Sequence, residues 1–76
     1  MADRLVIRLR ELRVEHDLTQ AMLADRIGVS RKTINTVENG IFIPSTLLAL
    51  RLARALGRPV EEIFSLEPLS QEGSET

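Results

Sequence analysis

Residues 18–40 constrain the fold more than any other part of this chain. Thr19 and Ser30 are residue types that begin helices, because their hydroxyls accept hydrogen bonds from free first-turn amides, and Gly28 and Gly40 can end them. Between these residues the apolar side chains recur at the spacing i, i+3, i+4, which turns them to one side of each helix. We therefore expect two short helices, over about 19–27 and 30–39, joined by a tight turn at 28–30. This arrangement is a helix-turn-helix.

The second of these helices has a polar outer face. It carries side chains that can donate hydrogen bonds to phosphates or to base edges: Arg31, Lys32, Thr33, Asn35, Thr36 and Asn39. The N-terminal end of such a helix is the part that meets the major groove of DNA. As isolated surface residues they would indicate little, so the interpretation depends on the motif that presents them.

Three further helices complete an all-α prediction. Leu5, Leu9 and Leu12 mark the inner face of a helix over about 3–16. Ser45 precedes a fourth helix over 46–56 and Pro59 opens a short fifth helix over 60–64. No segment alternates like a strand over a length that needs a sheet. We expect a folded domain over 1–64 and a short, acidic, flexible tail over 65–76, where the sequence lacks periodicity.

Composition narrows the class of protein. The chain has 76 residues and no cysteine, which excludes a disulfide scaffold and a Cys-ligated zinc site. No apolar run is long enough to span a membrane, and the start mixes charges unlike a signal peptide, so we expect a cytoplasmic protein. Residues 1–58 hold ten Lys and Arg against six acids, a net of +4, whereas 59–76 hold five Glu and no basic residue. The basic part could meet phosphate, although such a charge is also usual for a solvated surface.

Two segments of the sequence carry the motifs of a known protein family. The segments LTQAMLADRIGVSRKTINTVENG and PSTLLALRLARALGRPVEEIF resemble the lambdoid-repressor and Cro-like helix-turn-helix regulators, also called the XRE family, over about residues 5–64. The resemblance implies a five-helix lambda-repressor-like DNA-binding domain that usually acts as a homodimer on a pseudo-palindromic operator. Two positions depart from the pattern. Asp17 stands where Gly often ends the first helix, and Ile41 and Ile43 replace polar loop residues.

Roles in DNA binding follow from chemistry and then from the resemblance. Arg31 and Lys32 can donate to guanine O6 and N7, Asn35 can read adenine, and Thr36 can pack against a thymine methyl group. Contact with the DNA backbone, or support of it, is predicted for Gln20, Ser30, Thr33 and Asn39. From position alone Gln20 could equally face solvent, and the resemblance favours phosphate. Asn39 is expected to contact phosphate or to cap its own helix end.

For two further sets of residues we predict a structural role, in an ion pair and in a dimer interface. The resemblance implies an ion pair between Arg13 and Glu38, and an unpaired acid beside phosphates would oppose binding, which favours the pair over two independent charges. A surplus of apolar residues predicts a dimer interface, for which the candidates are Ile41, Phe42, Ile43, Leu47, Leu66 and Leu69. The alternative is that the loop over 41–43 folds back over its own core.

No catalytic constellation is predicted, and no cofactor or metal. His16 is a single histidine at a helix end, and the Ser and Thr residues are interpreted as helix caps because no base and orienting acid accompany them. We expect a sequence-specific regulator that binds double-stranded operator DNA, either a dimeric repressor or an autoregulating controller. The alternative is a protein-interaction module, such as the antitoxin partner of a toxin, but Arg31, Lys32 and Asn35 favour DNA.

Overall fold

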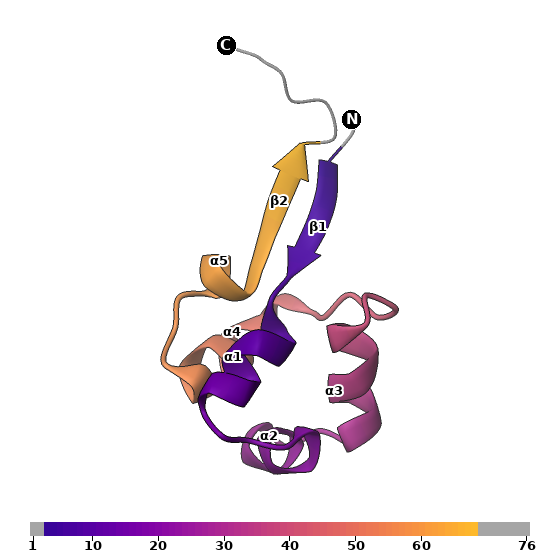
Figure 1. The fold of residues 1–76 in the computed structure, drawn as a ribbon. Coiled ribbons are helices and arrows are strands. Elements are labelled where there is room, and N and C mark those ends of the chain that lie inside the picture. The colour runs from indigo at the N-terminus through magenta and orange to yellow at the C-terminus, as the bar shows by residue number, and fades with distance from the viewer. Residues whose placement is uncertain (1–2, 69–76) are drawn as a thin grey trace.

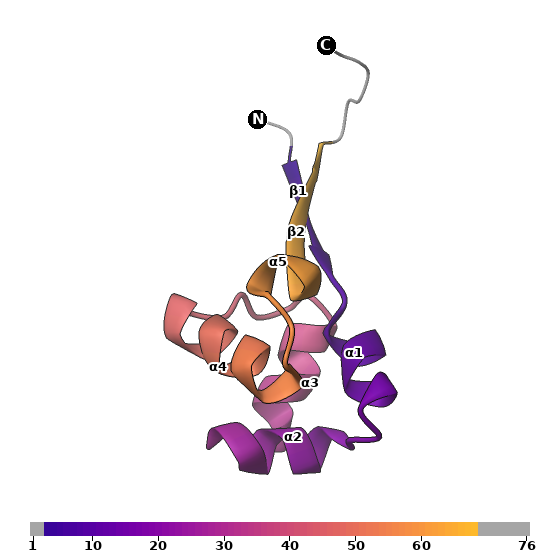
Figure 2. The ribbon, with the colours of Figure 1, turned by 90° about the vertical axis from the view of Figure 1, so that its left-hand side faces the viewer.

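A computed structural model describes residues 3–68, which form a helical body with a two-stranded ribbon projecting from it (Figure 1). The elements are, in order, β1 (Asp3–Ile7), α1 (Leu9–Glu15), α2 (Gln20–Ile27), α3 (Arg31–Glu38), α4 (Thr46–Leu56), α5 (Val60–Ile63) and β2 (Phe64–Pro68). Figure 2 shows α1 and α4 on opposite sides of the body, with α2 crossing the end farthest from the ribbon. In this part of the chain no helix has the length and apolar character needed to cross a membrane.

The predicted helix caps are confirmed. The hydroxyls of Thr19, Ser30 and Ser45 each accept a hydrogen bond from the amide three residues later, at 3.0–3.1 Å. Gly28 and Gly57 end α2 and α4 in the left-handed conformation, with φ of 76° and 63°. A residue with a Cβ is disfavoured there, so these glycines fix where each helix stops.

Asp17 takes the left-handed conformation after α1 without being glycine. Its φ is 56°, a conformation that Gly adopts freely and that Asp tolerates at some cost. The Asp17 amide donates to the Val14 carbonyl at 2.9 Å, and the Leu18 amide donates to the Arg13 carbonyl at 3.1 Å. These two bonds form a Schellman motif, which satisfies the last carbonyls of α1 and turns the chain into α2.

A single apolar core holds the helices together. Its buried side chains come from every helix and from the turn between α1 and α2: Leu9, Leu12, Leu18, Leu23, Ala24, Ile27, Ile34, Val37, Leu52, Leu56 and Ile63. Ile34 and Val37 are the inward-facing residues of α3, so they fix which side of that helix stays exposed. At about 1.5–3 kcal/mol for each large aliphatic side chain, their burial is the main term that stabilises α3 in place.

The ribbon corrects the all-α prediction. Residues 3–7 were expected to begin the first helix, but they form β1 and pair antiparallel with β2, while α1 begins only at Leu9. Val6 and Ile7 are β-branched and suit a strand. β2 also takes in residues 65–68 of the expected tail, whereas 69–76 lie outside the described residues. The helical spacing of Leu5 and Leu9 was misleading because the partner strand lies some sixty residues away in sequence.

The register gives the ribbon two different faces. Leu5 pairs with Leu66 and Ile7 with Phe64, so one face is apolar. Arg4 pairs with Glu67 on the other face, where their charged groups lie 3.7 Å apart. An isolated two-stranded ribbon is only marginally stable, so its apolar face must pack on something. At the base of the ribbon this face packs against the core, through Ile7 and Phe64.

Candidate nucleic-acid interface

Helix α3 presents a polar face to solvent. Arg31, Lys32 and Asn35 are exposed, and Thr33 and Thr36 are half-buried on the flank. Ser30 caps the N-terminus of α3, and the left-handed Gly28 ends α2 and begins the turn between the two helices. The face therefore offers a guanidinium, an ammonium and an amide, which can donate to acceptors on base edges or phosphates.

Glu38 lies at the end of α3 in a network with Arg10, Arg13 and Gln20, which we call the Glu38 network. Arg13 Nε donates to Glu38 Oε2 at 2.6 Å, and Arg13 Nη2 donates to Glu38 Oε1 at 3.2 Å. Gln20 Nε2 donates to Oε1 at 3.0 Å, and Arg10 Nε donates to it at 3.4 Å. The structure thus brings together Arg13 and Glu38, and it ties α3 to both α1 and α2.

Burial makes this network important for α3. The Glu38 side chain has no exposed surface and that of Arg13 is only 12% exposed. Burial opposes ionisation of the Glu38 carboxyl, but the hydrogen bonds from Arg13, Gln20 and Arg10, together with the charge of Arg13, outweigh it and lower its pKa. The carboxylate therefore stays ionised near neutral pH and is surrounded by donors, so it does not present its charge to an incoming phosphate.

Arg10 is the member of the network that sequence reasoning missed. It also donates through Nη2 to Asn39 Oδ1 at 3.3 Å, and its side chain stays 58% exposed. The available signal was its position three residues before Arg13, which places both on one face of α1. Arg10 therefore adds a partly free cation beside the end of α3.

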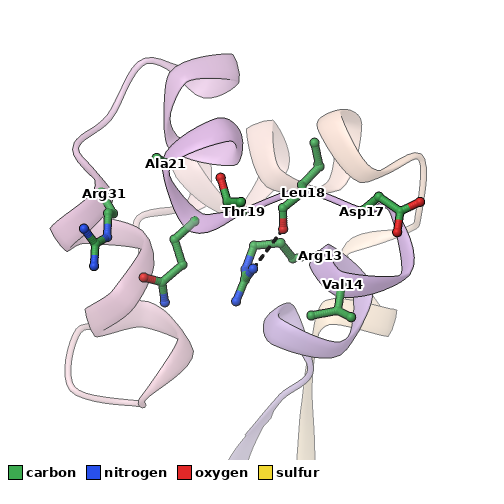
Figure 3. Close-up of a pocket in the computed structure, with 8 residues that line it drawn as sticks. Arg13, Val14, Asp17, Leu18, Thr19, Ala21 and Arg31 are labelled. Atoms are coloured by element: carbon green, nitrogen blue, oxygen red, sulfur yellow. Dashed lines mark hydrogen bonds between the residues drawn. The ribbon is translucent and has the colours of Figure 1, made fainter.

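The start of α2 borders a surface hollow beside α3. This hollow, of about 520 Å³, is lined by Arg13, Val14, Asp17, Leu18, Thr19, Gln20, Ala21 and Arg31. Figure 3 shows Arg13 and Arg31 on opposite sides of it, with the Arg13 guanidinium bonded to the Leu18 carbonyl at 2.8 Å. Thr19 caps only the amide of Met22, so the first-turn amides of Gln20 and Ala21 lack intrahelical acceptors.

Several polar side chains of α3 are engaged within the protein. The Ser30 and Thr33 hydroxyls bond each other at 3.0 Å, and the Thr36 hydroxyl donates to the carbonyls of Lys32 and Thr33, both at 3.0 Å. Asn39 is the C-cap residue of α3, and its Nδ2 donates to the Asn35 carbonyl at 2.8 Å. Arg31, Lys32 and Asn35 therefore keep the most freedom to donate to a ligand.

The five predicted interface residues that the structure describes do not lie together. Ile41 and Phe42 line a hollow beside α3 with Ser30, Lys32, Thr33 and Thr36. Ile43 lines a different groove, between α4 and the ribbon, with Leu5, Leu50 and other residues. Leu47 and Leu66 are exposed on α4 and β2, and Leu69 lies outside the described residues. The loop does not fold back over the core, because Ile41 and Ile43 are 76% and 72% exposed.

An exposed donor face on the second helix of a helix-turn-helix, held by a buried ionic network, is the arrangement of a DNA-binding protein. Comparison with known proteins agrees. The family model described as helix-turn-helix matches residues 9–63. A helix-turn-helix transcriptional regulator of Methanothermobacter thermautotrophicus is 53% identical over 60 residues, covering 78% of this chain and 87% of that protein.

Solved structures give the same result. The restriction-modification controller protein C.AhdI from Aeromonas hydrophila is 39% identical, with a TM-score of 0.68 over 71% of this chain and 82% of its own. The transcriptional regulator VanUg shares the fold, with a TM-score of 0.71 over 90% of this chain and 91% of its own, at 19% identity. The chain belongs to the XRE-type helix-turn-helix family of DNA-binding transcriptional regulators.

Proposed function

We propose that this regulator binds a specific operator by inserting α3 into the major groove. The observation that carries the proposal is the orientation of α3. Its apolar residues Ile34 and Val37 are buried, and the Glu38 network holds its end, so Arg31, Lys32 and Asn35 face outward together. A recognition helix needs this fixed orientation because a base-edge contact depends on both distance and direction.

In this proposal three side chains read the bases. Arg31 and Lys32 donate to acceptor atoms such as guanine O6 and N7, and Asn35 donates to and accepts from adenine. Thr36 contributes its methyl group, because its hydroxyl is bonded to the helix backbone.

The DNA backbone is contacted from α2. The free amides at the start of α2 and the second Nε2 hydrogen of Gln20 can donate to a phosphate, which the Arg13 and Arg31 charges also attract. Ser30, Thr33 and Asn39 play supporting roles, since their polar groups hold the ends of α3.

The protein acts as a homodimer through what we call the ribbon surface: Leu5, Ile43, Leu47, Leu50 and Leu66. Leu47, Leu50 and Leu66 are 60%, 54% and 66% exposed, and Leu5 and Leu66 form a cross-strand pair that continues the groove beside α4. Monomers seldom leave such an apolar surface uncovered. A second copy packed on it by two-fold symmetry gives two recognition helices for a pseudo-palindromic site, which suits a repressor or an autoregulating controller in the cytoplasm.

Selection of duplexes from a random or genomic pool, followed by fluorescence anisotropy, tests the proposal. We expect enrichment of a two-fold symmetric sequence, with affinity that falls steeply as salt rises because bound phosphates release counterions. Arg31→Ala should cost roughly 1–3 kcal/mol and relax the preference at one base pair of each half-site.

Arg54→Ala is the matched control. It removes one exposed cation from α4, away from α3, so its effect should be small. Equal affinities of the wild type and Arg31→Ala for the selected sequence would contradict the role of Arg31, and failure to enrich any sequence would contradict operator binding. Stable capture of another protein by the exposed face of α3, without DNA binding, would favour a protein-interaction module instead.

A further inference from the structure

The loop after α3 places two large apolar side chains directly beside the proposed recognition face. Gly40 adopts a φ of 73° and its amide donates to the Val37 carbonyl at 3.1 Å. The amides of Ile41 and Phe42 both donate to the Thr36 carbonyl, at 2.9 and 3.2 Å. These bonds fold the chain back against the end of α3, so the position of Ile41 and Phe42 is set by the helix itself.

The resulting hollow, which we call the α3 hollow, is lined by Ser30, Lys32, Thr33, Thr36, Ile41 and Phe42. Its polar groups are largely occupied. The hydroxyl of Thr36 donates to backbone carbonyls, and those of Ser30 and Thr33 bond each other. What remains to contact a ligand is apolar, with the Lys32 ammonium available on the same flank of the helix.

Exposure of these apolar groups is costly in the free protein. Ile41 is 76% exposed and Phe42 is 45% exposed, although a well-packed loop would bury them. They are separated from the ribbon surface, because Ile43 lines the groove on the other side of the loop. A ligand that approaches the recognition face of α3 would cover them at the same time.

We infer that the α3 hollow recognises the 5-methyl group of a thymine in the operator, with Ile41 and the Thr36 methyl as its principal contacts and Phe42 behind them. This inference rests on the proposed binding of α3 in the major groove. Thymine is the one standard base that presents a methyl group there, next to the O4 acceptor. The hollow matches both features, since an apolar wall suits the methyl and Lys32 can donate to O4.

Replacement of single thymines by deoxyuridine tests this inference, because it removes the methyl and leaves every hydrogen-bonding group unchanged. In the selected operator, each thymine is replaced in turn and binding is measured by anisotropy. The wild type should lose roughly fourfold in affinity at one position of each half-site, the value expected for uncovering one methyl group. Other thymines should show little change.

Ile41→Ser is compared with Arg54→Ala, which lies outside both the α3 hollow and the ribbon surface. Ile41→Ser should bind the thymine and deoxyuridine duplexes equally at that position, while Arg54→Ala should keep the wild-type ratio of the two affinities.

The outcomes separate the two proposals. Specific binding by the wild type that is indifferent to every deoxyuridine replacement would overturn the inference and leave operator binding intact. The same is true if Ile41→Ser and Phe42→Ala both keep the full preference for thymine. If the wild type binds no duplex specifically, both the inference and the proposed function are wrong.

Discussion

Arg13 Nε lies 2.6 Å from Glu38 Oε2, and this ion pair joins α1 to the end of α3 across 25 residues of sequence. The bond is nearly enclosed, since the Glu38 side chain is fully covered and that of Arg13 is 12% exposed. Arg13 also donates to the Leu18 carbonyl in the turn between α1 and α2. One guanidinium on α1 therefore holds both the turn before α2 and the end of α3, the helix that we propose enters DNA.

Removal of either partner should destabilise the domain and weaken DNA binding together. Loss of one member of a buried pair leaves an unpaired charge, which costs roughly 3–5 kcal/mol. A double-mutant cycle with Arg13→Ala and Glu38→Ala, followed by urea unfolding, should give a coupling energy of about 0.5–3 kcal/mol. A parallel cycle on the exposed pair Arg58 and Glu15, 3.0 Å apart, should give a smaller coupling energy, because solvent screens exposed charges. Additive effects at Arg13 and Glu38 would show that the contact does not stabilise the fold.

Acid should weaken the fold through Glu38. Its pKa in the folded protein lies below the ordinary value of 4.5, so the unfolded chain binds this proton more readily. The stabilisation is complete above about pH 4.5 and declines as the pH falls through the folded-state pKa. Urea unfolding at pH 7 and pH 3 should show a smaller loss of stability for Glu38→Gln than for the wild type.

Glu61→Gln serves as the control for this pH dependence, because Glu61 is an exposed glutamate in α5. It should lose as much stability between the two pH values as the wild type does. If Glu38→Gln also behaves like the wild type, the Glu38 carboxylate is not the titrating group.

Self-association should depend on the ribbon surface. Leu50→Glu places a charge in the groove between α4 and the ribbon and should shift the protein to monomer in sedimentation equilibrium, with weaker operator binding as a consequence. Ile41→Glu introduces the same charge beside α3 and should leave the dimer intact. A wild-type monomer at high concentration, or a dimer that tolerates Leu50→Glu, would contradict this interface.

Asp17→Gly should stabilise the domain by about 0.5–1 kcal/mol. Asp17 holds a φ of 56°, which costs a residue with a Cβ roughly 1–2 kcal/mol. Glycine avoids this cost, and the saving exceeds the extra backbone entropy that glycine loses on folding. The change also removes a negative charge from the C-terminal end of α1, where it is unfavourable. Thermal unfolding measures the effect, and Asp17→Ala should be destabilising by comparison because it keeps the strain. A lower melting temperature for Asp17→Gly would show that the Asp17 side chain stabilises the turn.

The sequence by itself determined the helix-turn-helix, because its signals are local. Thr19 caps an amide three residues later, and Gly28 ends the same helix through its own backbone conformation. The spacing of the apolar residues in α3 shows which side of the helix is buried, whichever segments cover it. The left-handed conformation of Asp17 was foreseeable for the same reason.

Only the tertiary structure decided the features that join distant residues. The pairing of β1 with β2 depends on cross-strand contacts such as Leu5 with Leu66, whose energy does not appear in the periodicity of either segment. The position of Arg10 in the Glu38 network likewise required α1 and α3 to be placed side by side. The loop after α3 sends Ile41 to one side and Ile43 to the other, because the bonds to the Thr36 carbonyl and the left-handed Gly40 set its path. The sequence showed that these residues are apolar, but which surface each one joins depends on the packing of the whole domain.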